Sequence, residues 1–302
     1  MKVFVAGASG AIGIPLVRAL IAARHEVTAL TRTPDKAGML RALGATPAVA
    51  DALDAAALQR ALLDARPTHV IHQLTALPKA GVRTAGDLAP TNRLRIEGTR
   101  NLIAAAASAG SQRLIIGSFA PLHAHITNVP PEMQAGIDAV RSMEGQALEA
   151  AKRGLLEAVV LRYGLFYGPD NPATQHMIAL ARKRMLPVVR GDRSLLPFIH
   201  IDDAVSATVA SLTRGQSGAT YDIVDDHAAS MTEMVVDLAK EIGAKRPITV
   251  PSWLPKLLAP YLARITSLRV PLSNAKARAD MGWEPAYPSY REGLRDVVRT
   301  AA

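Results

Sequence analysis

Residues 3–13 read VFVAGASGAIG, a short apolar run that leads directly into three evenly spaced glycines. Gly7 permits a tight turn, Gly10 lets backbone N–H groups approach a pyrophosphate, and Gly13 allows a helix to pack closely on a strand. An apolar strand pattern precedes the glycines and a helical pattern follows them. The stretch therefore predicts a dinucleotide-binding turn that holds the phosphates at a helix N-terminus.

The first half of the chain continues this alternation of short apolar runs and longer amphipathic ones. The expected strands are 2–6, 26–30, 46–49, 69–73, 113–117 and 158–162, and the expected helices are 12–23, 36–43, 55–65, 92–109 and 137–152. Each crossover is long enough to contain a helix and return in parallel. The pattern predicts an α/β fold with a doubly wound parallel sheet of Rossmann type.

The composition changes after Gly168-Pro169, where prolines become frequent. Prolines interrupt regular helices and strands, so this part is expected to be loop-rich. We expect residues 1–168 to form the dinucleotide-binding Rossmann domain and residues 169–302 to form a smaller C-terminal substrate lobe. The lobe is expected to interleave with the sheet, because residues 198–225 include one more strand pattern at 219–224.

The end of the second predicted strand, LTRTP at residues 30–34, bears on the choice of cofactor. An acidic residue there would bind the ribose 2′-hydroxyl of NAD and repel the 2′-phosphate of NADP. No acid appears before Asp35, whereas Arg32 offers a guanidinium beside the hydroxyls of Thr31 and Thr33. The stretch predicts NADP(H), and Lys36 either assists Arg32 or lies exposed on the next helix.

Several further motifs resemble those of the extended short-chain dehydrogenases/reductases, the NAD-dependent epimerase/dehydratase-like family. GASGAIG at 7–13 resembles the family's GxxGxxG, GTRNL at 98–102 its GTxNLL, LRYGLFYGP at 161–169 its LRxxxxYGP, and FIHIDD at 198–203 its FxHxDD. The resemblance extends from residue 1 to about 298 and implies an oxidoreductase. Together with the residues argued above, it gives these expected cofactor contacts: Gly7, Ser9, Gly10, Ala11, Ile12, Gly13, Thr31, Arg32, Thr33, Asp51, Ala52, Leu74, Thr75, Ala76 and Tyr163.

The chain departs from this family at the helix that normally carries a YxxxK pair, in which the lysine lowers the tyrosine pKa for proton exchange. By position the tyrosine would fall near Gly136 or Ile137 and the lysine near Val140 or Arg141. Neither Tyr nor Lys occurs between Leu122 and Ala151. The chain is therefore identified as an atypical member that needs another proton donor.

Three residues are candidates for catalysis in place of that pair. Ser118 matches the family serine that hydrogen-bonds a substrate carbonyl, or it caps a turn. Tyr163 follows the sixth predicted strand and either supplies a proton, if its pKa is depressed, or packs as an aromatic wall. His125 lies in the loop after Ser118 and either acts near neutral pH or faces solvent. No third ligand accompanies His123 and His125, so no metal site is expected.

Composition excludes several classes of protein. The net charge is +9, but the basic residues are scattered and aromatic residues are only 4%, which argues against nucleic acid as a partner. The absence of cysteine rules out disulfides and thiolate metal sites, and no apolar run is long enough to span a membrane. The first residues carry no secretory pattern, so a cytoplasmic location is expected.

These observations leave three functions open. The first is an NADP(H)-dependent oxidoreductase acting on a small carbonyl or alcohol substrate, with a proton from Tyr163, a loop histidine or water. The second is a redox-neutral epimerase or dehydratase, and the third is a non-catalytic redox sensor similar to the NmrA-like regulators. By analogy with the family, a homodimer is expected through the helices near 92–109 and 137–152.

Overall fold

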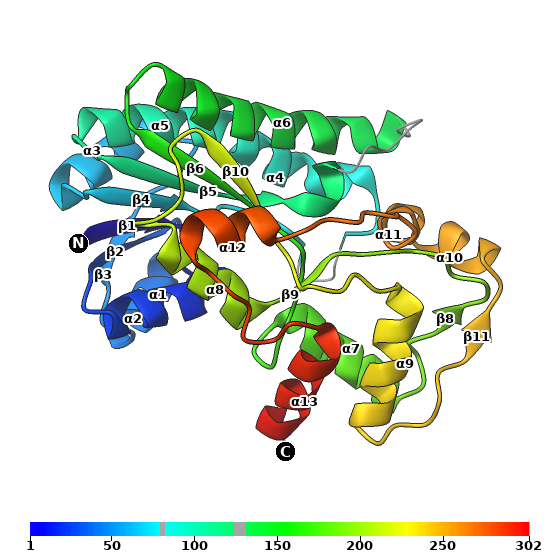
Figure 1. Cartoon of the computed structure of the whole chain (residues 1–302). Helices are drawn as coiled ribbons and strands as arrows, with labels where there is room; N and C mark the ends of the chain where they lie inside the picture. The colour runs from blue at the N-terminus through cyan, green and yellow to red at the C-terminus, as the bar shows by residue number, and fades with distance from the viewer. Residues whose placement is uncertain (79–81, 124–130, 302) are drawn as a thin grey trace.

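The computed structural model describes residues 1–78, 82–123 and 131–301, and a seven-stranded parallel sheet lies at its centre (Figure 1). The strand order is β10-β6-β5-β4-β1-β2-β3. The bounds are β1 (Lys2–Ala6), β2 (Glu26–Thr31), β3 (Thr46–Val49), β4 (His69–His72), β5 (Arg113–Phe119), β6 (Glu157–Tyr163) and β10 (Ala219–Ile223). The order reverses between β1 and β4, which is the place where doubly wound sheets bind their ligands. The predicted fold class is confirmed.

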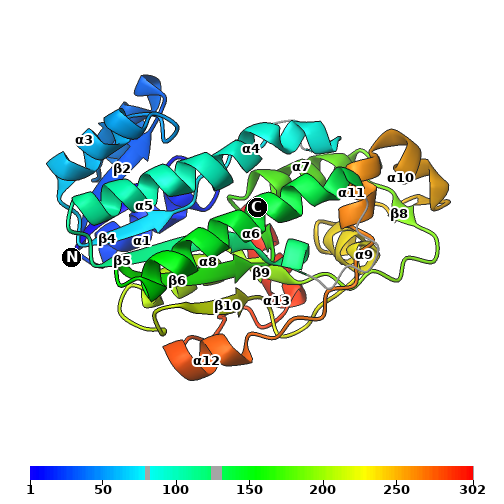
Figure 2. The same ribbon diagram turned by 90° about the horizontal axis from the view of Figure 1, so that it is seen from above.

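Helices cover both faces of the sheet (Figures 1 and 2). The upper face in Figure 1 carries α3 (Ala55–Ala65), α5 (Thr99–Ser108) and α6 (Pro131–Lys152), and the lower face carries α1 (Gly13–Ala22), α2 (Ala37–Ala42) and α8 (Ile201–Ala210). Strand residues alternate between two buried clusters: Ile116 of β5 packs with Met143 of α6, whereas Ile115 packs with Leu16 of α1. Burial on both faces explains why these strands read as continuous apolar runs.

Two helices differ from their predicted bounds. The predicted helix 92–109 is a continuous run of α4 (Ala89–Arg93), a π-helical turn (Leu94–Gly98) and α5. The helix predicted at 137–152 is longer, because α6 begins at Pro131. Proline suits the first turn of a helix, where its missing N–H would have no partner. A proline therefore marks the start of a helix that the periodicity alone placed later.

The second lobe lies beyond the carboxyl ends of the strands, on the right of Figure 1. Its helices are α7 (Pro172–Arg182), α9 (Met231–Glu241), α10 (Trp253–Leu258), α11 (Pro260–Ile265) and α13 (Tyr290–Ala301), and α12 (Ala275–Met281) packs beside β10. Two small sheets pair β7 (Leu165–Tyr167) with β9 (Phe198–His200) and β8 (Val188–Val189) with β11 (Thr249–Val250). The prolines of this lobe do more than interrupt regular structure, because Pro172 and Pro260 begin helices.

The second half of the chain is tied back to the sheet at α8. His200 caps this helix, since its Nδ1 accepts the N–H of Asp202 at 3.3 Å. The buried Asp203 carboxylate accepts the N–H groups of Ala286 and Tyr287 at 2.7 and 3.0 Å. Both β10, which belongs to the central sheet, and α8, which packs on α1, come after residue 168 in the chain. The division of the chain into two domains at residue 168 stays a prediction. No helix in the described ranges combines the length and apolar character that crossing a membrane requires.

Candidate nucleotide site and active site

The turn between β1 and α1 has the geometry of a phosphate-binding loop. Gly7 adopts φ +94°, and a Cβ there would lie 2.4 Å from the carbonyl oxygen of Gln73. A Cβ on Gly13 would lie 2.2 Å from the carbonyl oxygen of Gly7. The Gly10 N–H closes the turn on Gly7 at 3.0 Å, whereas the N–H groups of Ala11 and Ile12 have no acceptor among the described residues. Free amides at a helix start suit a phosphate group.

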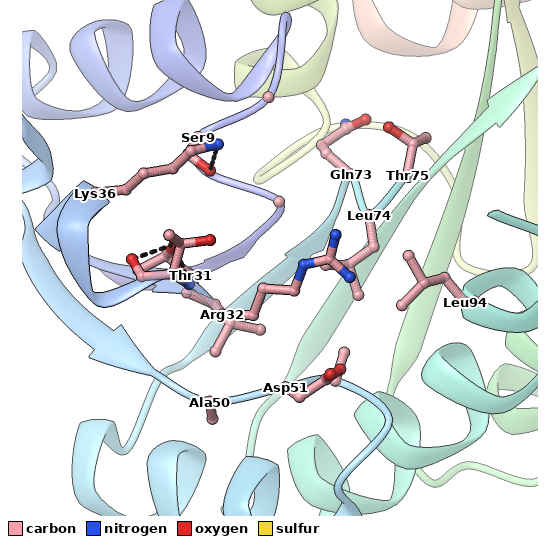
Figure 3. Close-up of a pocket in the computed structure, with 15 residues that line it drawn as sticks. Ser9, Thr31, Arg32, Lys36, Ala50, Asp51, Gln73, Leu74, Thr75 and Leu94 are labelled. Carbon is pink, nitrogen blue, oxygen red and sulfur yellow. Dashed lines mark hydrogen bonds between the residues drawn. The ribbon is translucent and has the colours of Figure 1, made fainter. Parts of the chain in front are cut away.

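A pocket opens directly beside this turn at the carboxyl ends of β1, β2 and β4 (Figure 3). Its lining comprises the turn, the end of β2, the segment after β3 and the segment after β4. The residues are Gly7, Ser9, Gly10, Leu30, Thr31, Arg32, Thr33, Lys36, Ala50, Asp51, Ala52, Gln73, Leu74, Thr75 and Leu94. Phosphate-binding amides at one end and apolar side chains at the other fit a dinucleotide.

Two cations line the pocket near the end of β2. In Figure 3 the guanidinium of Arg32 extends across the pocket toward Leu74, and Lys36 reaches Ser9 of the phosphate turn. The Lys36 Nζ donates to the Ser9 hydroxyl at 3.3 Å, which links the two segments. The Thr33 N–H donates to the Thr31 hydroxyl at 3.2 Å and fixes the bend after the strand. The pocket thus presents positive charge near the end of β2.

Most of the sequence-predicted contacts line the pocket, and five do not. The five that are absent from the lining are Ala11, Ile12, Gly13, Ala76 and Tyr163. Ile12 and Gly13 are buried under the turn, and the Ala76 N–H is taken by the hydroxyl of Thr91 at 3.0 Å. The sequence reasoning missed these lining residues: Leu30, Ala50, Gln73 and Leu94. Leu30, Ala50 and Gln73 lie at or directly after the ends of strands, which is the signal that could have indicated them, whereas Leu94 begins the π-helical turn and carries no such signal.

Tyr163 lies behind the pocket rather than in its lining. Its hydroxyl is bonded on both sides: it accepts from the Gln73 Nε2 at 2.9 Å and pairs with the Thr208 hydroxyl at 2.7 Å. Burial raises the pKa of Tyr163 to about 12, although both hydrogen bonds oppose the shift. The predicted depression of the Tyr163 pKa is therefore wrong, and no cation is among the groups that oppose the rise. The contacts instead hold the Gln73 side chain against the strand ends.

Ser118 and Tyr163 lie on opposite faces of the sheet. Ser118 shares its face with Leu114 and Ile116, which pack against α6, because alternate residues of a strand point the same way. Tyr163 packs in the cluster that contains α1. Ser118 is only 7% exposed, and its Oγ has no hydrogen-bond partner within the described ranges. An unpaired buried hydroxyl costs free energy, which a bound substrate oxygen would recover.

A buried ion pair fixes α6 beside Ser118. Arg162 lies in register with Ser118 on the neighbouring strand, and its Nη2 contacts the Glu144 Oε2 of α6 at 2.6 Å. The strand β6 thus supplies a charged partner for Glu144. About one and two turns before Glu144, toward the carboxyl edge of the sheet, α6 presents the buried Val140 and then Gly136. The family's tyrosine was expected near Gly136 or Ile137 and its lysine near Val140 or Arg141.

The second lobe contains a separate cavity of about 520 Å³ between β8, α9 and α11. Five cations line it, with Asp192 as its one acid: Arg190, Arg193, Lys256, Arg264 and Arg269. The size is in the usual range for small-molecule sites. His125, the remaining candidate for catalysis, lies outside the described residues.

The fold, the glycine turn and the pocket together define a Rossmann-type dinucleotide-binding protein with a second lobe over the strand ends. The chain belongs to the NAD dependent epimerase/dehydratase family, whose model matches residues 3–225. It is thus an extended short-chain dehydrogenase/reductase, and family membership supports a nicotinamide-nucleotide site.

Known relatives agree with this assignment. A 3-diazoavenalumate denitrifying reductase of a Streptomyces species is 36% identical over 97% of this chain and 99% of its own. A 2-alkyl-3-oxoalkanoate reductase of Stenotrophomonas maltophilia is 28% identical over 82% of this chain and 77% of its own. The solved UDP-glucose 4-epimerase of Thermus thermophilus in complex with NAD superposes with a TM-score of 0.79, 23% identity and full coverage of both chains. The reductase names support an oxidoreductase, and the solved structure supports the fold.

Proposed function

We propose that this chain is an NADP(H)-dependent reductase of small carbonyl compounds. The observation that carries the cofactor preference is the pair of cations at the end of β2, where Arg32 and Lys36 line the pocket and Asp35 does not. A guanidinium forms charge-assisted bonds with a 2′-phosphate, whereas a carboxylate at that place would repel it. The glycine turn binds the pyrophosphate that NAD and NADP share, so it does not distinguish the two cofactors, and the preference depends on Arg32.

The test is a titration of the purified protein with NADPH and with NADH. Replacement of Arg32 by Ala should raise the Kd for NADPH about tenfold to 100-fold, the loss of one charge-assisted hydrogen bond, and change the Kd for NADH less than about threefold. Arg60→Ala is the matched control, because Arg60 is exposed on α3 and does not line the pocket. Equal losses for both cofactors in Arg32→Ala would overturn the NADP(H) assignment.

The carbonyl substrate is inferred from the relatives and from Ser118. One relative is named as a reductase of 2-alkyl-3-oxoalkanoates, and another, from Stigmatella aurantiaca, is named as a ketoreductase. The unpartnered Ser118 hydroxyl can donate to a carbonyl oxygen at the carboxyl edge of the sheet. With a 2-alkyl-3-oxoalkanoate as probe, Ser118→Ala should lower kcat/KM for NADPH oxidation about tenfold to 100-fold and leave the Kd for NADPH unchanged.

A redox-sensor function is the second candidate, favoured by the absence of the YxxxK pair from α6. Tight NADPH binding without oxidation across a panel of carbonyl compounds would support the sensor. A redox-neutral epimerase or dehydratase would convert its substrate without a net change in NADPH. The cation-lined cavity of the second lobe favours a substrate with an anionic group over a sensor with no second ligand. A homodimer and a cytoplasmic location stay predictions.

A further inference from the structure

Gly136 occupies one of the two positions on α6 where the family's tyrosine was expected, and the hydroxyl of Tyr261 lies close to it. A Cβ placed on Gly136 would meet three atoms at van der Waals distance: Leu88 Cδ1 at 3.8 Å, the Tyr261 hydroxyl at 3.8 Å and Leu122 Cδ1 at 3.9 Å. Tyr261 comes from α11 of the second lobe, so its side chain crosses from that lobe to the helix beside Ser118. The absence of a side chain at Gly136 leaves room for this hydroxyl.

The hydroxyl of Tyr261 is unpartnered although its residue is almost entirely buried. Tyr261 is 8% exposed, and its oxygen makes no hydrogen bond to any residue that the structure describes. The buried tyrosines at 163, 167, 221 and 290 all use their hydroxyls in hydrogen bonds. Unlike the Ser118 Oγ, the Tyr261 oxygen is not among the fully buried unpaired polar atoms, so it keeps access to solvent. An accessible phenol with no hydrogen-bond partner in the described residues is free to contact a ligand.

A buried cation accompanies Tyr261. Arg95 is 9% exposed and lies in the π-helical turn, directly after Leu94 of the nucleotide pocket. Its Nη1 donates to the Asn92 Oδ1 at 3.5 Å, and within the described ranges it forms no ion pair with a carboxylate. Burial raises the pKa of Tyr261, and the Arg95 charge opposes that rise. π-Helical turns occur frequently at functional sites, and this one packs against α6, the helix that the Tyr261 hydroxyl approaches at Gly136.

The other candidates for proton transfer fit less well. Tyr163 points to the opposite face of the sheet from Ser118 and has both hydrogen bonds satisfied. Val140, at the expected lysine position, is fully buried and apolar. Gly136 itself has no side chain. At the expected tyrosine position on α6, Tyr261 supplies the phenol, and Arg95 supplies the charge that acts on it.

We propose that Tyr261 is the proton donor of the reductase and that Arg95 is its positioning residue, so that the two replace the missing tyrosine and lysine of α6. The inference rests on the proposed carbonyl reduction. The reduced nicotinamide, when bound, supplies a hydride to the carbonyl carbon. The carbonyl oxygen gains the electron pair of the broken π bond and accepts the proton of Tyr261, while Ser118 donates a hydrogen bond to it. The phenolate that remains is stabilised by Arg95 until water returns a proton.

The first experiment measures NADPH oxidation with a 2-alkyl-3-oxoalkanoate and, separately, NADPH binding. Tyr261→Phe removes one unpaired hydroxyl, so folding and the Kd for NADPH should be unchanged while kcat falls about 100-fold to 1000-fold. Tyr221→Phe is the matched control, a buried tyrosine at the outer strand β10 whose loss should leave kcat within about twofold. A Tyr261→Phe protein with the kcat of the parent would overturn the inference and leave the reductase assignment intact.

The second experiment needs no substrate and follows tyrosine ionisation in the ligand-free protein by ultraviolet difference spectroscopy. Arg95→Met removes the charge at similar side-chain volume and should shift the ionisation of one tyrosine to higher pH. The additional change Tyr261→Phe should abolish that shift. Arg95→Lys should restore part of it, together with part of the kcat. A titration curve that is the same with and without Arg95 would overturn the pair. A parent protein that oxidises no NADPH with any carbonyl compound would contradict the proposed function, and the titration would still decide whether the pair exists.

Discussion

The two sides of the strand edge are built in different ways. The phosphate turn and the cations of the nucleotide side come from two short segments, at 7–13 and 30–36, and the turn depends largely on backbone amides and on glycines that admit them. The residues proposed for the substrate side, Ser118, Arg95 and Tyr261, come from β5, the π-helical turn and α11. A site built from the backbone of one short segment can be predicted from the sequence, whereas a site built from side chains that are distant in the sequence depends on the tertiary fold.

The largest effect is expected from Gly13→Ala, which adds one methyl group to the phosphate-binding turn. Gly13→Ala would place a Cβ 2.2 Å from the Gly7 carbonyl oxygen, and that oxygen is backbone and cannot move freely. The turn should be displaced, with a loss of about 3 kcal/mol in the free energy of unfolding and no measurable NADPH binding. Urea denaturation and a fluorescence titration check both. Gly145→Ala in α6, where a Cβ meets nothing within 4 Å, should be neutral or slightly stabilising.

The second lobe should respond to pH through Asp225, which has no counterpart in the nucleotide pocket. Asp225 is 3% exposed, its Oδ2 accepts from the Tyr167 hydroxyl at 3.0 Å, and burial raises its pKa to about 8. The unfolded chain ionises near pH 4 and the folded chain near pH 8. Between these values only the folded chain keeps the proton, so its contribution to stability is full below about pH 4 and declines as the pH rises to about 8.

Asp225→Asn should remove that decline, because the amide oxygen still accepts from Tyr167 and no charge forms. At about pH 8 the variant should be more stable than the parent by about 2 kcal/mol, and near pH 5 the two should differ little. Urea denaturation at both values measures the difference. Parallel stability curves for the two proteins would show that Asp225 is already ionised at low pH.

The sequence predicted the fold and most of the nucleotide pocket because each depends on short-range patterns. Strand and helix alternation placed the seven strands of the sheet, and the glycine spacing placed the turn. It did not identify Gln73 or Leu94, whose roles come from the ends of strands and helices that meet in space. Tyr261 could not be found in this way, because its hydroxyl lies near Gly136, a residue that is distant in the sequence and on a different element.

A smaller effect is expected at Tyr163, which separates a supporting role from a chemical one. Tyr163→Phe removes the partner of the Gln73 Nε2 and one of two partners of the Thr208 hydroxyl, which also donates to Ala204 at 2.6 Å. The loss of these bonds should cost about 1 to 2 kcal/mol of stability. The kcat should fall only a few-fold, through displacement of Gln73. A drop of about 100-fold in kcat at unchanged stability would instead make Tyr163 the proton donor.

The smallest expected effect tests how the positive charge is divided on the nucleotide side. Lys36 is exposed and contacts the Ser9 hydroxyl at 3.3 Å, a bond that water can replace, whereas Arg32 extends over the pocket with no partner among the described residues. Lys36→Ala should therefore raise the Kd for NADPH only about twofold to fivefold, and added salt should reduce the difference, because exposed charges are screened. Titrations at low and high ionic strength measure it. A loss as large as that of Arg32→Ala, and insensitive to salt, would mean that Lys36 binds the phosphate directly and that the two cations share the role assigned to the guanidinium.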